Sequence, residues 1–145
     1  MKKLLYTFLI FASGMLLAQK SNTVKFAVYN DAIGTVKMFD NHKGDIEKFN
    51  VYKTKANLPS HLKKFEYLAD NGLVEVKLKK NAGNPDTISL ELLNSQGNVP
   101  KNSPVFVEGY KIEGPETRIY SEIIDNVEVI DFNGQKCLSI STIQK

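Results

Sequence analysis

Two histidines and one cysteine are the side chains of this 145-residue chain best suited to catalysis or to binding a transition metal. His42 and His61 lie 19 residues apart, and Cys137 is the single cysteine. A zinc site needs three or four converging nitrogen, sulfur or oxygen ligands, which this spacing does not supply. Asp40 and Asp45 offer oxygen atoms around His42, but no acidic residue stands at the twelfth position that a calcium loop requires. The sequence therefore predicts no metal site and no cofactor.

A hydrolytic site would need a nucleophile beside a base, and the chain offers one such neighbouring pair. Ser60 directly precedes His61, but adjacent residues on a helix do not face each other. Neither a Gly-x-Ser-x-Gly elbow nor a glycine-rich phosphate loop is present in the sequence. Aspartates and glutamates are spread along the chain, so only the fold can pair them for acid–base chemistry. The sequence predicts no catalytic residue.

Tyrosines are the other side chains that suggest recognition, because each offers an apolar ring with a polar tip. We predict that they are partly buried residues of sheets and helices, and a tyrosine-bearing contact surface is the alternative. The five that follow the N-terminal segment share no common spacing: Tyr29, Tyr52, Tyr67, Tyr110 and Tyr120. Cys137 lies in an alternating run and is predicted to be a half-buried strand residue.

The N-terminus has the pattern of a secretory signal peptide over residues 1–18. Met1-Lys2-Lys3 is basic, and the uncharged apolar run Leu4 to Leu17 has 14 residues. At about 1.5 Å per residue this run is too short to cross a hydrocarbon core of about 30 Å. Ala18 is small enough to precede the cleavage site, which leaves Gln19 as the first mature residue. We expect a periplasmic or secreted protein without a transmembrane segment in its mature chain.

Composition indicates one α+β domain over residues 19–145. These 127 residues suffice for one core but not for two. The whole chain has a net charge of +3, and loss of Lys2 and Lys3 brings the mature chain near +1. Such a balance gives no field that would hold nucleic acid. Because one cysteine cannot form an internal disulfide, the fold must depend on its hydrophobic core.

Alternating apolar residues predict strands in the first half of the chain. These are Thr23 to Tyr29, Thr35 to Phe39, Phe49 to Thr54, and Leu73 to Lys80. Asn30-Asp31 is predicted to be a turn, and Asn41 to Lys48 a loop. Between them, Leu58 to Ala69 changes to helical spacing, with an apolar face of Leu62, Phe65, Leu68 and Ala69. Pro59 suits the first turn of this helix, and Asn71-Gly72 suits its end.

The second half predicts two short helices and three strands. Asp86 or Thr87 can cap a helix with Ile88, Leu90, Leu92 and Leu93 as its apolar face, which Gly97 to Pro104 ends. Val105 to Val107 is apolar on both faces and suits a central strand. Glu116 to Ile124 is expected to be helical. Val127 to Phe132 and Lys136 to Ile143 flank Asn133-Gly134, the favoured pair of a type I′ hairpin turn. Six or seven strands and two or three short helices give an α+β fold with a small mixed sheet.

From about residue 104 the chain resembles the plug domain of TonB-dependent outer-membrane receptors. The segments that carry this resemblance are Pro104-Val105-Phe106-Val107-Glu108-Gly109, Ile124-Asp125-Asn126-Val127-Glu128-Val129, and Ile140-Ser141-Thr142-Ile143-Gln144-Lys145. Glu108 replaces the usual Asp, and a bare turn replaces the plug's Gly- and Tyr-rich loop. A membrane barrel needs at least eight further strands, so the resemblance implies a free-standing plug-like module.

These observations predict an exported, non-enzymatic binding or accessory module of the cell envelope. Its partner would be an envelope protein or peptide, contacted through strand edges or the tyrosine-bearing surface. The alternative is a small exported enzyme with a carboxylate and tyrosine site. A deep pocket with two close carboxylates would favour the enzyme, whereas an open strand edge would favour the binding module.

Overall fold

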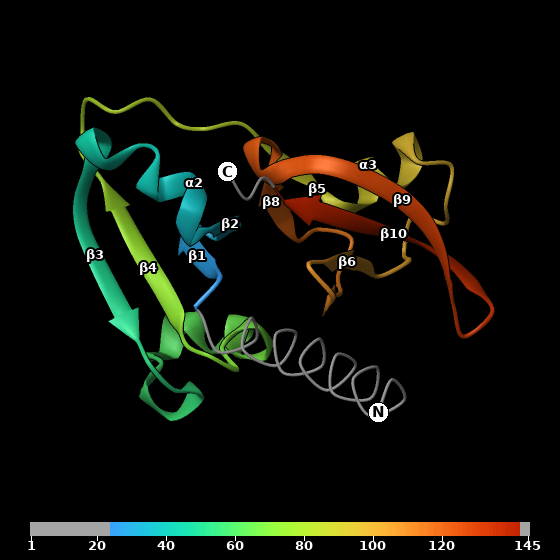
Figure 1. Cartoon of the computed structure of the whole chain (residues 1–145), viewed down its shortest axis with the longest axis horizontal. Helices are drawn as coiled ribbons and strands as arrows, with labels where there is room; N and C mark the ends of the chain where they lie inside the picture. Colours follow the sequence, from blue (N-terminus) through green and yellow to red (C-terminus); the bar gives the residue numbers. More distant parts are fainter. Residues whose placement is uncertain (1–23, 143–145) are drawn as a thin grey trace, which may run out of the picture.

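The computed structural model describes residues 24–142, in which ten strands form two sheets (Figure 1). The predicted signal peptide and the expected cleavage site at Ala18 lie outside the described residues. The six-stranded sheet has the order β3-β4-β1-β2-β8-β5, and the four-stranded sheet has the order β7-β6-β10-β9. The fold is α+β, as predicted from sequence. Its strands are β1 (Phe26–Tyr29), β2 (Ala32–Thr35), β3 (Ile46–Tyr52), β4 (Leu73–Leu78), β5 (Thr87–Ser89), β6 (Val105–Val107), β7 (Tyr110–Ile112), β8 (Arg118–Tyr120), β9 (Ile124–Phe132) and β10 (Gln135–Thr142).

The six-stranded sheet begins with the tight hairpin of β1 and β2. Asn30 and Asp31 form its turn, and both adopt positive φ angles of 52° and 61°. This confirms the predicted turn, since Asn and Asp tolerate the left-handed conformation better than most residues. β4 then pairs with β1 in parallel and with β3 in antiparallel orientation. Strand β8 joins the far side of β2, and β5 completes the sheet.

A short helix replaces the strand that sequence predicted at Thr35 to Phe39. Thr35 ends β2, and its Oγ1 accepts a hydrogen bond of 3.1 Å from the backbone N of Met38. This N-cap satisfies a backbone donor that a new helix leaves without a partner, and α2 (Val36–Asp40) follows. Met38 and Phe39 pack so closely on Gly34 that a side chain there would contact both. The prediction was wrong because the β-branched residues Thr35 and Val36 favour a strand, whereas Thr35 acts as the N-cap of a helix.

The predicted helix at Leu58 to Ala69 is a 3-10 helix, η3 (Ser60–Leu68), preceded by Pro59 at its N-cap. Its predicted apolar face is buried, with Leu62, Phe65 and Leu68 in the core. Gly72 follows at a φ of +101°, close against the backbone carbonyl of Tyr52. Three shorter 3-10 turns connect other elements: η1 (Lys43–Asp45), η2 (Lys55–Asn57) and η4 (Ser121–Ile123). The first of these lies within the predicted loop, whose last three residues belong instead to β3.

Of the two helices predicted in the second half, the first begins later than expected and the second is wrong. Thr87–Ser89 forms strand β5, and Ser89 caps α3 (Leu90–Gln96) through a 3.2 Å hydrogen bond from the backbone N of Leu92. Strand β8 and the turn η4 occupy the segment Glu116 to Ile124, which was predicted to be helical. Ile119 is fully buried there between β2 and β5. Pairing with strands distant in sequence therefore overrides the local helical spacing.

The four-stranded sheet contains the hairpin predicted at Asn133-Gly134. The two turn residues have φ angles of 51° and 81°, which confirms that both positions need a left-handed backbone. Glu108-Gly109 forms a second tight turn between β6 and β7 in the same way. Strand β6 lies between β7 and β10, so the predicted central position of Val105 to Val107 is also confirmed.

One hydrophobic core joins both sheets and the helices between them. It contains Ile33 and Ile119 of the six-stranded sheet together with Val107 and Ile140 of the four-stranded sheet. Helix α3 lies so close to β10 that a Cβ at Gly97 would be 2.8 Å from Cδ2 of Leu138. The two sheets are therefore held by shared burial, which is roughly proportional to the apolar area removed from water.

Candidate functional site

Each histidine is paired with a glutamate, and the two pairs lie in different places. Nε2 of His42 is 2.8 Å and 3.0 Å from the two carboxylate oxygens of Glu122. Nε2 of His61 is 2.8 Å from Oε1 of Glu75. Within residues 24–142, no three His, Cys, Asp or Glu side chains lie close enough to hold a metal ion. Neither Asp40 nor Asp45 therefore completes a metal site with His42.

The pair of His61 with Glu75 is extended by Tyr52, whose hydroxyl donates to Oε2 of Glu75 at 3.2 Å. Burial raises the pKa of Tyr52, and the negative charge of Glu75 raises it further. A tyrosine whose pKa is raised keeps its proton and is a poor base or nucleophile. This cluster connects η3 to β3 and β4, and its chemistry fits a structural link better than catalysis.

A hollow of about 250 Å³ lies beside the pair of His42 with Glu122. Asp45, Phe39 and Asn84 also line it. A carboxylate that orients a histidine could support acid–base chemistry, but no serine, threonine, cysteine or lysine is among the lining residues. The lining residues thus offer carboxylates and an imidazole but no hydroxyl, thiol or amine nucleophile.

A second hollow of about 200 Å³ lies on the other side of Asn84 and contains Tyr29, Arg118 and Tyr120. The hydroxyl of Tyr120 donates to the backbone carbonyl of Tyr29 at 2.5 Å. Burial raises the pKa of Tyr120 far above its ordinary value. The Arg118 guanidinium donates two hydrogen bonds to Thr87, from Nε to Oγ1 and from Nη2 to the backbone carbonyl oxygen. The Tyr120 hydroxyl and two nitrogens of the Arg118 guanidinium are thus already engaged within the hollow.

The tyrosines do not form one contact surface. Tyr120 is buried, and Tyr110 makes an edge-to-face contact with Phe26, with 5.1 Å between ring centroids. Tyr29, Tyr52 and Tyr67 are partly buried against the core. Cys137 is fully buried, which is deeper than the half-buried position predicted for it.

The open edge of β9 is the most accessible feature of the second sheet. This nine-residue strand is the last in the order β7-β6-β10-β9, and it runs along the outside of the molecule (Figure 1). Its five residues from Asp125 to Val129 are all exposed. An edge strand of this length presents backbone N–H and C=O groups on which another strand can pair.

The direction of these backbone groups follows from the neighbouring strand. The carbonyl of Ile140 on β10 accepts a 3.0 Å hydrogen bond from the N of Glu108, on the side of β6. The N–H and C=O of one strand residue point the same way, so Ile140 turns away from β9, and its partner Val127 turns away from β10. The alternation of an antiparallel pair extends this to Val129 and Asp131. The two-residue turn at Asn133-Gly134 requires the same pattern, because the residues flanking such a turn form a hydrogen-bonded pair.

The side chains along this edge combine exposed apolar residues with carboxylates. Val127 and Val129 are 39% and 53% exposed, although they lie on the same face as the buried Leu138 and Ile140. The two valines lie at the margin of the core, where the side chains of a further strand would cover them. On the other face, the rings of Phe132 and Phe106 pack edge to face with centroids 5.0 Å apart.

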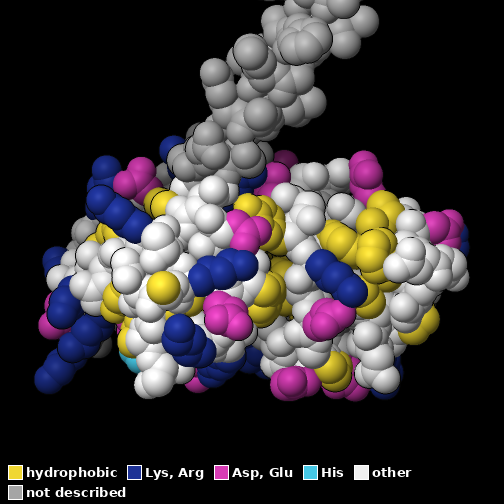
Figure 2. Space-filling view, turned by 90° about the horizontal axis from the view of Figure 1, so that it is seen from below, with side chains coloured by type: hydrophobic (Ala, Val, Ile, Leu, Met, Phe, Trp, Pro, Cys, Tyr) yellow, Lys and Arg dark blue, Asp and Glu magenta, His cyan; other side chains and the backbone are white. Residues whose placement is uncertain are grey.

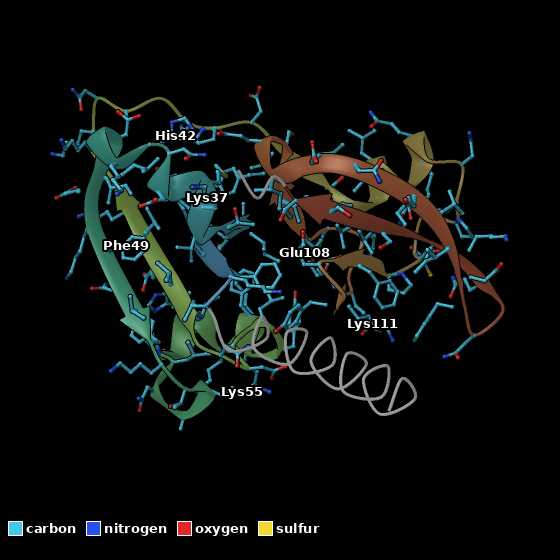
Figure 3. The ribbon with its side chains drawn as sticks, viewed as in Figure 1. Lys37, His42, Phe49, Lys55, Glu108 and Lys111 are labelled. Carbon is cyan, nitrogen blue, oxygen red and sulfur yellow. The ribbon has the colours of Figure 1, made fainter. Side chains whose placement is uncertain are left out.

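Hydrophobic side chains gather toward the end of the molecule that carries the four-stranded sheet, between lysines and acidic residues (Figure 2). Lys111 belongs to β7 of this sheet and is well separated from His42 and from Phe49 on β3 (Figure 3). Its Nζ is 5.1 Å from the ring centroid of Phe132. Glu108 fixes the end of β10, because its Oε1 accepts hydrogen bonds from the backbone N and the Oγ1 of Thr142, at 2.6 Å and 2.7 Å.

Strand β3 forms the edge of the other sheet and is less open to pairing. It also exposes two apolar side chains, Phe49 and Val51. Each edge strand has one shift of register, between Ile46 and Lys48 in β3 and between Ile124 and Asn126 in β9. Such irregularities bend a strand and interrupt its row of backbone groups. The uninterrupted register is longer in β9, where it covers seven residues from Asn126 to Phe132, than in β3, where it covers five from Lys48 to Tyr52. We therefore take the β9 edge as the candidate functional site.

Sequence reasoning pointed to strand edges but could not say which strands would be edges. The available signal was the exposed alternation of Val127 and Val129 with charged residues, next to a strong turn. Within residues 24–142, no helix combines the length and the apolar character that a membrane crossing requires. Comparison with protein-family models, with curated proteins and with solved structures finds no match.

Proposed function

We propose that this protein is an exported accessory module of the cell envelope that binds an extended segment of another protein by adding it as a strand to β9. The observation that carries the proposal is the outward direction of the backbone groups of Val127 and Val129, next to exposed valine side chains. Main-chain hydrogen bonds give affinity in strand addition, and alternate side chains give specificity. This edge offers both kinds of contact.

The alternative of a small enzyme is less well supported by the geometry. The hollow beside His42 and Glu122 has about 250 Å³, below the usual range of about 300–1,000 Å³ for ligand sites. Of its two carboxylates, Asp45 and Glu122, the second is already engaged with the histidine. The β9 edge, in contrast, has backbone groups that no strand of the described chain uses.

The resemblance to plug domains is part of the same proposal. The segments of this resemblance that lie within the described residues belong to β6, β9, β10 and the turn at Glu108-Gly109. Export is proposed on the pattern of residues 1–18. Intact-mass measurement of the exported protein should give a chain that starts near Gln19. A mature protein that still carries Leu4 to Leu17 would contradict export by cleavage.

Amide hydrogen exchange tests strand addition directly. Amides of Val127, Val129 and Asp131 should exchange fast in the free protein and become protected when a peptide selected from a display library binds. Val129→Pro should abolish this binding, because proline removes one outward N–H and is tolerated on edge strands. Val129→Thr keeps the N–H and should bind.

The variant Ile130→Pro serves as the matched control, since its N–H points toward β10. It should lower the melting temperature, whereas Val129→Pro should change it much less. Binding that survives Val129→Pro with unchanged affinity would refute strand addition at this edge. So would protection confined to residues around His42.

A further inference from the structure

The charge of the β9 edge identifies the kind of strand that it accepts. Resting on the proposed strand addition, we propose that the partner segment is basic, with a Lys or Arg opposite Glu128 and opposite the two aspartates that flank it. Ile124–Phe132 contains Asp125, Glu128 and Asp131 and no basic residue. Opposite charges on directly facing residues of neighbouring strands are favourable, and like charges are unfavourable.

These carboxylates remain available to a partner strand. Among the described residues, the bond that Glu128 accepts is a long one of 3.3 Å from Nδ2 of Asn126. Asp131 makes a 2.7 Å ion pair with Lys136, and both side chains are largely exposed. An exposed pair of this kind contributes little and is easily exchanged for another cation. A partner lysine can therefore compete for Asp131.

The surrounding protein strengthens the same preference. Residues 83–142 contain nine acidic and four basic side chains, whereas residues 24–82 contain seven acidic and eleven basic ones. The four-stranded sheet thus belongs to the acidic part of the chain. A surface of one sign attracts ligands of the opposite sign and raises their association rate, in a manner that salt weakens.

The order of residues along β9 defines the partner's pattern. Val127 and Val129 call for apolar side chains opposite them, with one basic residue between. Asp131 calls for a basic residue at one outer position, and Asp125, the extra residue at the register shift of β9, places a negative charge at the other. Since the two aspartates lie three residues on either side of Glu128, the pattern reads the same in both directions. The motif is basic-x-apolar-basic-apolar-x-basic, for a parallel or an antiparallel partner.

The same charges disfavour pairing between two β9 edges. An antiparallel pair that overlaps the whole strand would place Glu128 opposite Glu128 of a second copy. It would also place each Asp131 opposite an Asp125. Every charged position would then face a like charge. An unfavourable alternative of this kind contributes to specificity as much as a favourable contact does.

The test uses a blocked seven-residue peptide with lysines at its first, fourth and seventh positions, valines at its third and fifth, and threonines between. Its binding to the full mature chain is measured by fluorescence anisotropy and by amide exchange of β9. The matched peptide has glutamates in place of the lysines. We expect the lysine peptide to bind at least tenfold more tightly, and added salt to reduce the difference.

Charge reversal on the protein completes the design. Glu128→Lys should weaken binding of the lysine peptide by roughly fivefold, the upper range for one cross-strand pair. Glu47→Lys makes the same change of net charge on the β3 edge and should leave binding unchanged. Equal binding of the two peptides at β9 would overturn the basic partner while leaving strand addition intact. Failure of both peptides to protect β9 would overturn both proposals.

Discussion

Replacing Gly97 with Ala should destabilise the protein through contact with a single side chain of β10. Gly97 ends α3 with a φ of −84° and a ψ of 2°, which alanine adopts without strain. Its new Cβ would lie 2.8 Å from Cδ2, 3.0 Å from Cδ1 and 3.4 Å from Cγ of Leu138. Leu138 is 1% exposed, so any rotation of its side chain is into the buried core rather than into solvent. The substitution therefore makes Leu138 press on its core neighbours or moves α3 away from β10.

The magnitude follows from two opposing effects. Overpacking a buried site costs about 1–3 kcal/mol. Loss of backbone freedom in the unfolded chain returns about 0.4–1 kcal/mol for Gly→Ala. We expect a net loss of about 0.5–2 kcal/mol in the free energy of unfolding. Leu138→Ala alone should cost about 2–5 kcal/mol. In that background Gly97→Ala should stabilise, because the atoms it would contact are gone.

Urea denaturation followed by far-UV circular dichroism measures all four members of this cycle, since the chain has no tryptophan. We expect a coupling energy of about 1–3 kcal/mol between the two sites. Gly83→Ala is the control, because no atom lies within 4 Å of a Cβ at this position. An equal cost of Gly97→Ala with and without Leu138 would refute the contact between α3 and β10.

Three further predictions concern other parts of the fold. Gly134→Val should cost roughly 1–3 kcal/mol, because a β-branched residue is strained at a φ of +81° although no atom obstructs it; a melting temperature equal to wild type would contradict the type I′ turn. Burial, aided by Glu113, raises the pKa of Tyr67 to about 12, so the contribution of Tyr67 to stability should be complete below pH 10 and be lost progressively as the pH rises from 10 to 12. Tyr67→Phe should weaken this dependence without abolishing it, because the pKa values of Tyr52 and Tyr120 are raised as well; urea denaturation across that range measures the difference. Cys137 is fully buried, and burial raises the pKa of its thiol; labelling by a thiol reagent should therefore follow global unfolding, and fast labelling of the native protein would show that the sheet opens locally.

Local patterns were sufficient where a side chain and its neighbours in sequence determine the structure. The turn at Asn133-Gly134 and the alternation of β4 were both predicted, because turn chemistry and periodicity are local properties. The strand predicted at Thr35 to Phe39 failed for a local reason as well. Thr35 Oγ1 captures the N of Met38 and starts a helix, and Thr is among the preferred N-cap residues.

Partners distant in sequence determined the rest. Ile119 was assigned to a helix because Ile119 and Ile123 share helical spacing, yet β2 and β5 enclose it as a strand. The edge position of β9 is of the same kind. It exists because β6 pairs with the far side of β10, and residue 105 meets residue 138 in that register. A short stretch of sequence does not contain both β6 and β10. The sequence could therefore predict that a strand edge is the candidate site but not that β9 is that edge.

The parallel pairing of β6 with β10 also governs when folding can finish. Strand β2 pairs with β8, whose residues lie 86 positions later in the chain, so the six-stranded sheet cannot be completed before β8 is present. In the four-stranded sheet, β6 and β9 both pair with β10, so neither pairing can form until β10 has been synthesised. Contacts this distant in sequence slow folding, because long loops must close before any contact rewards them. During synthesis the chain would therefore stay without its native sheets until these late strands are available, and the four-stranded sheet would form only after β10 is free.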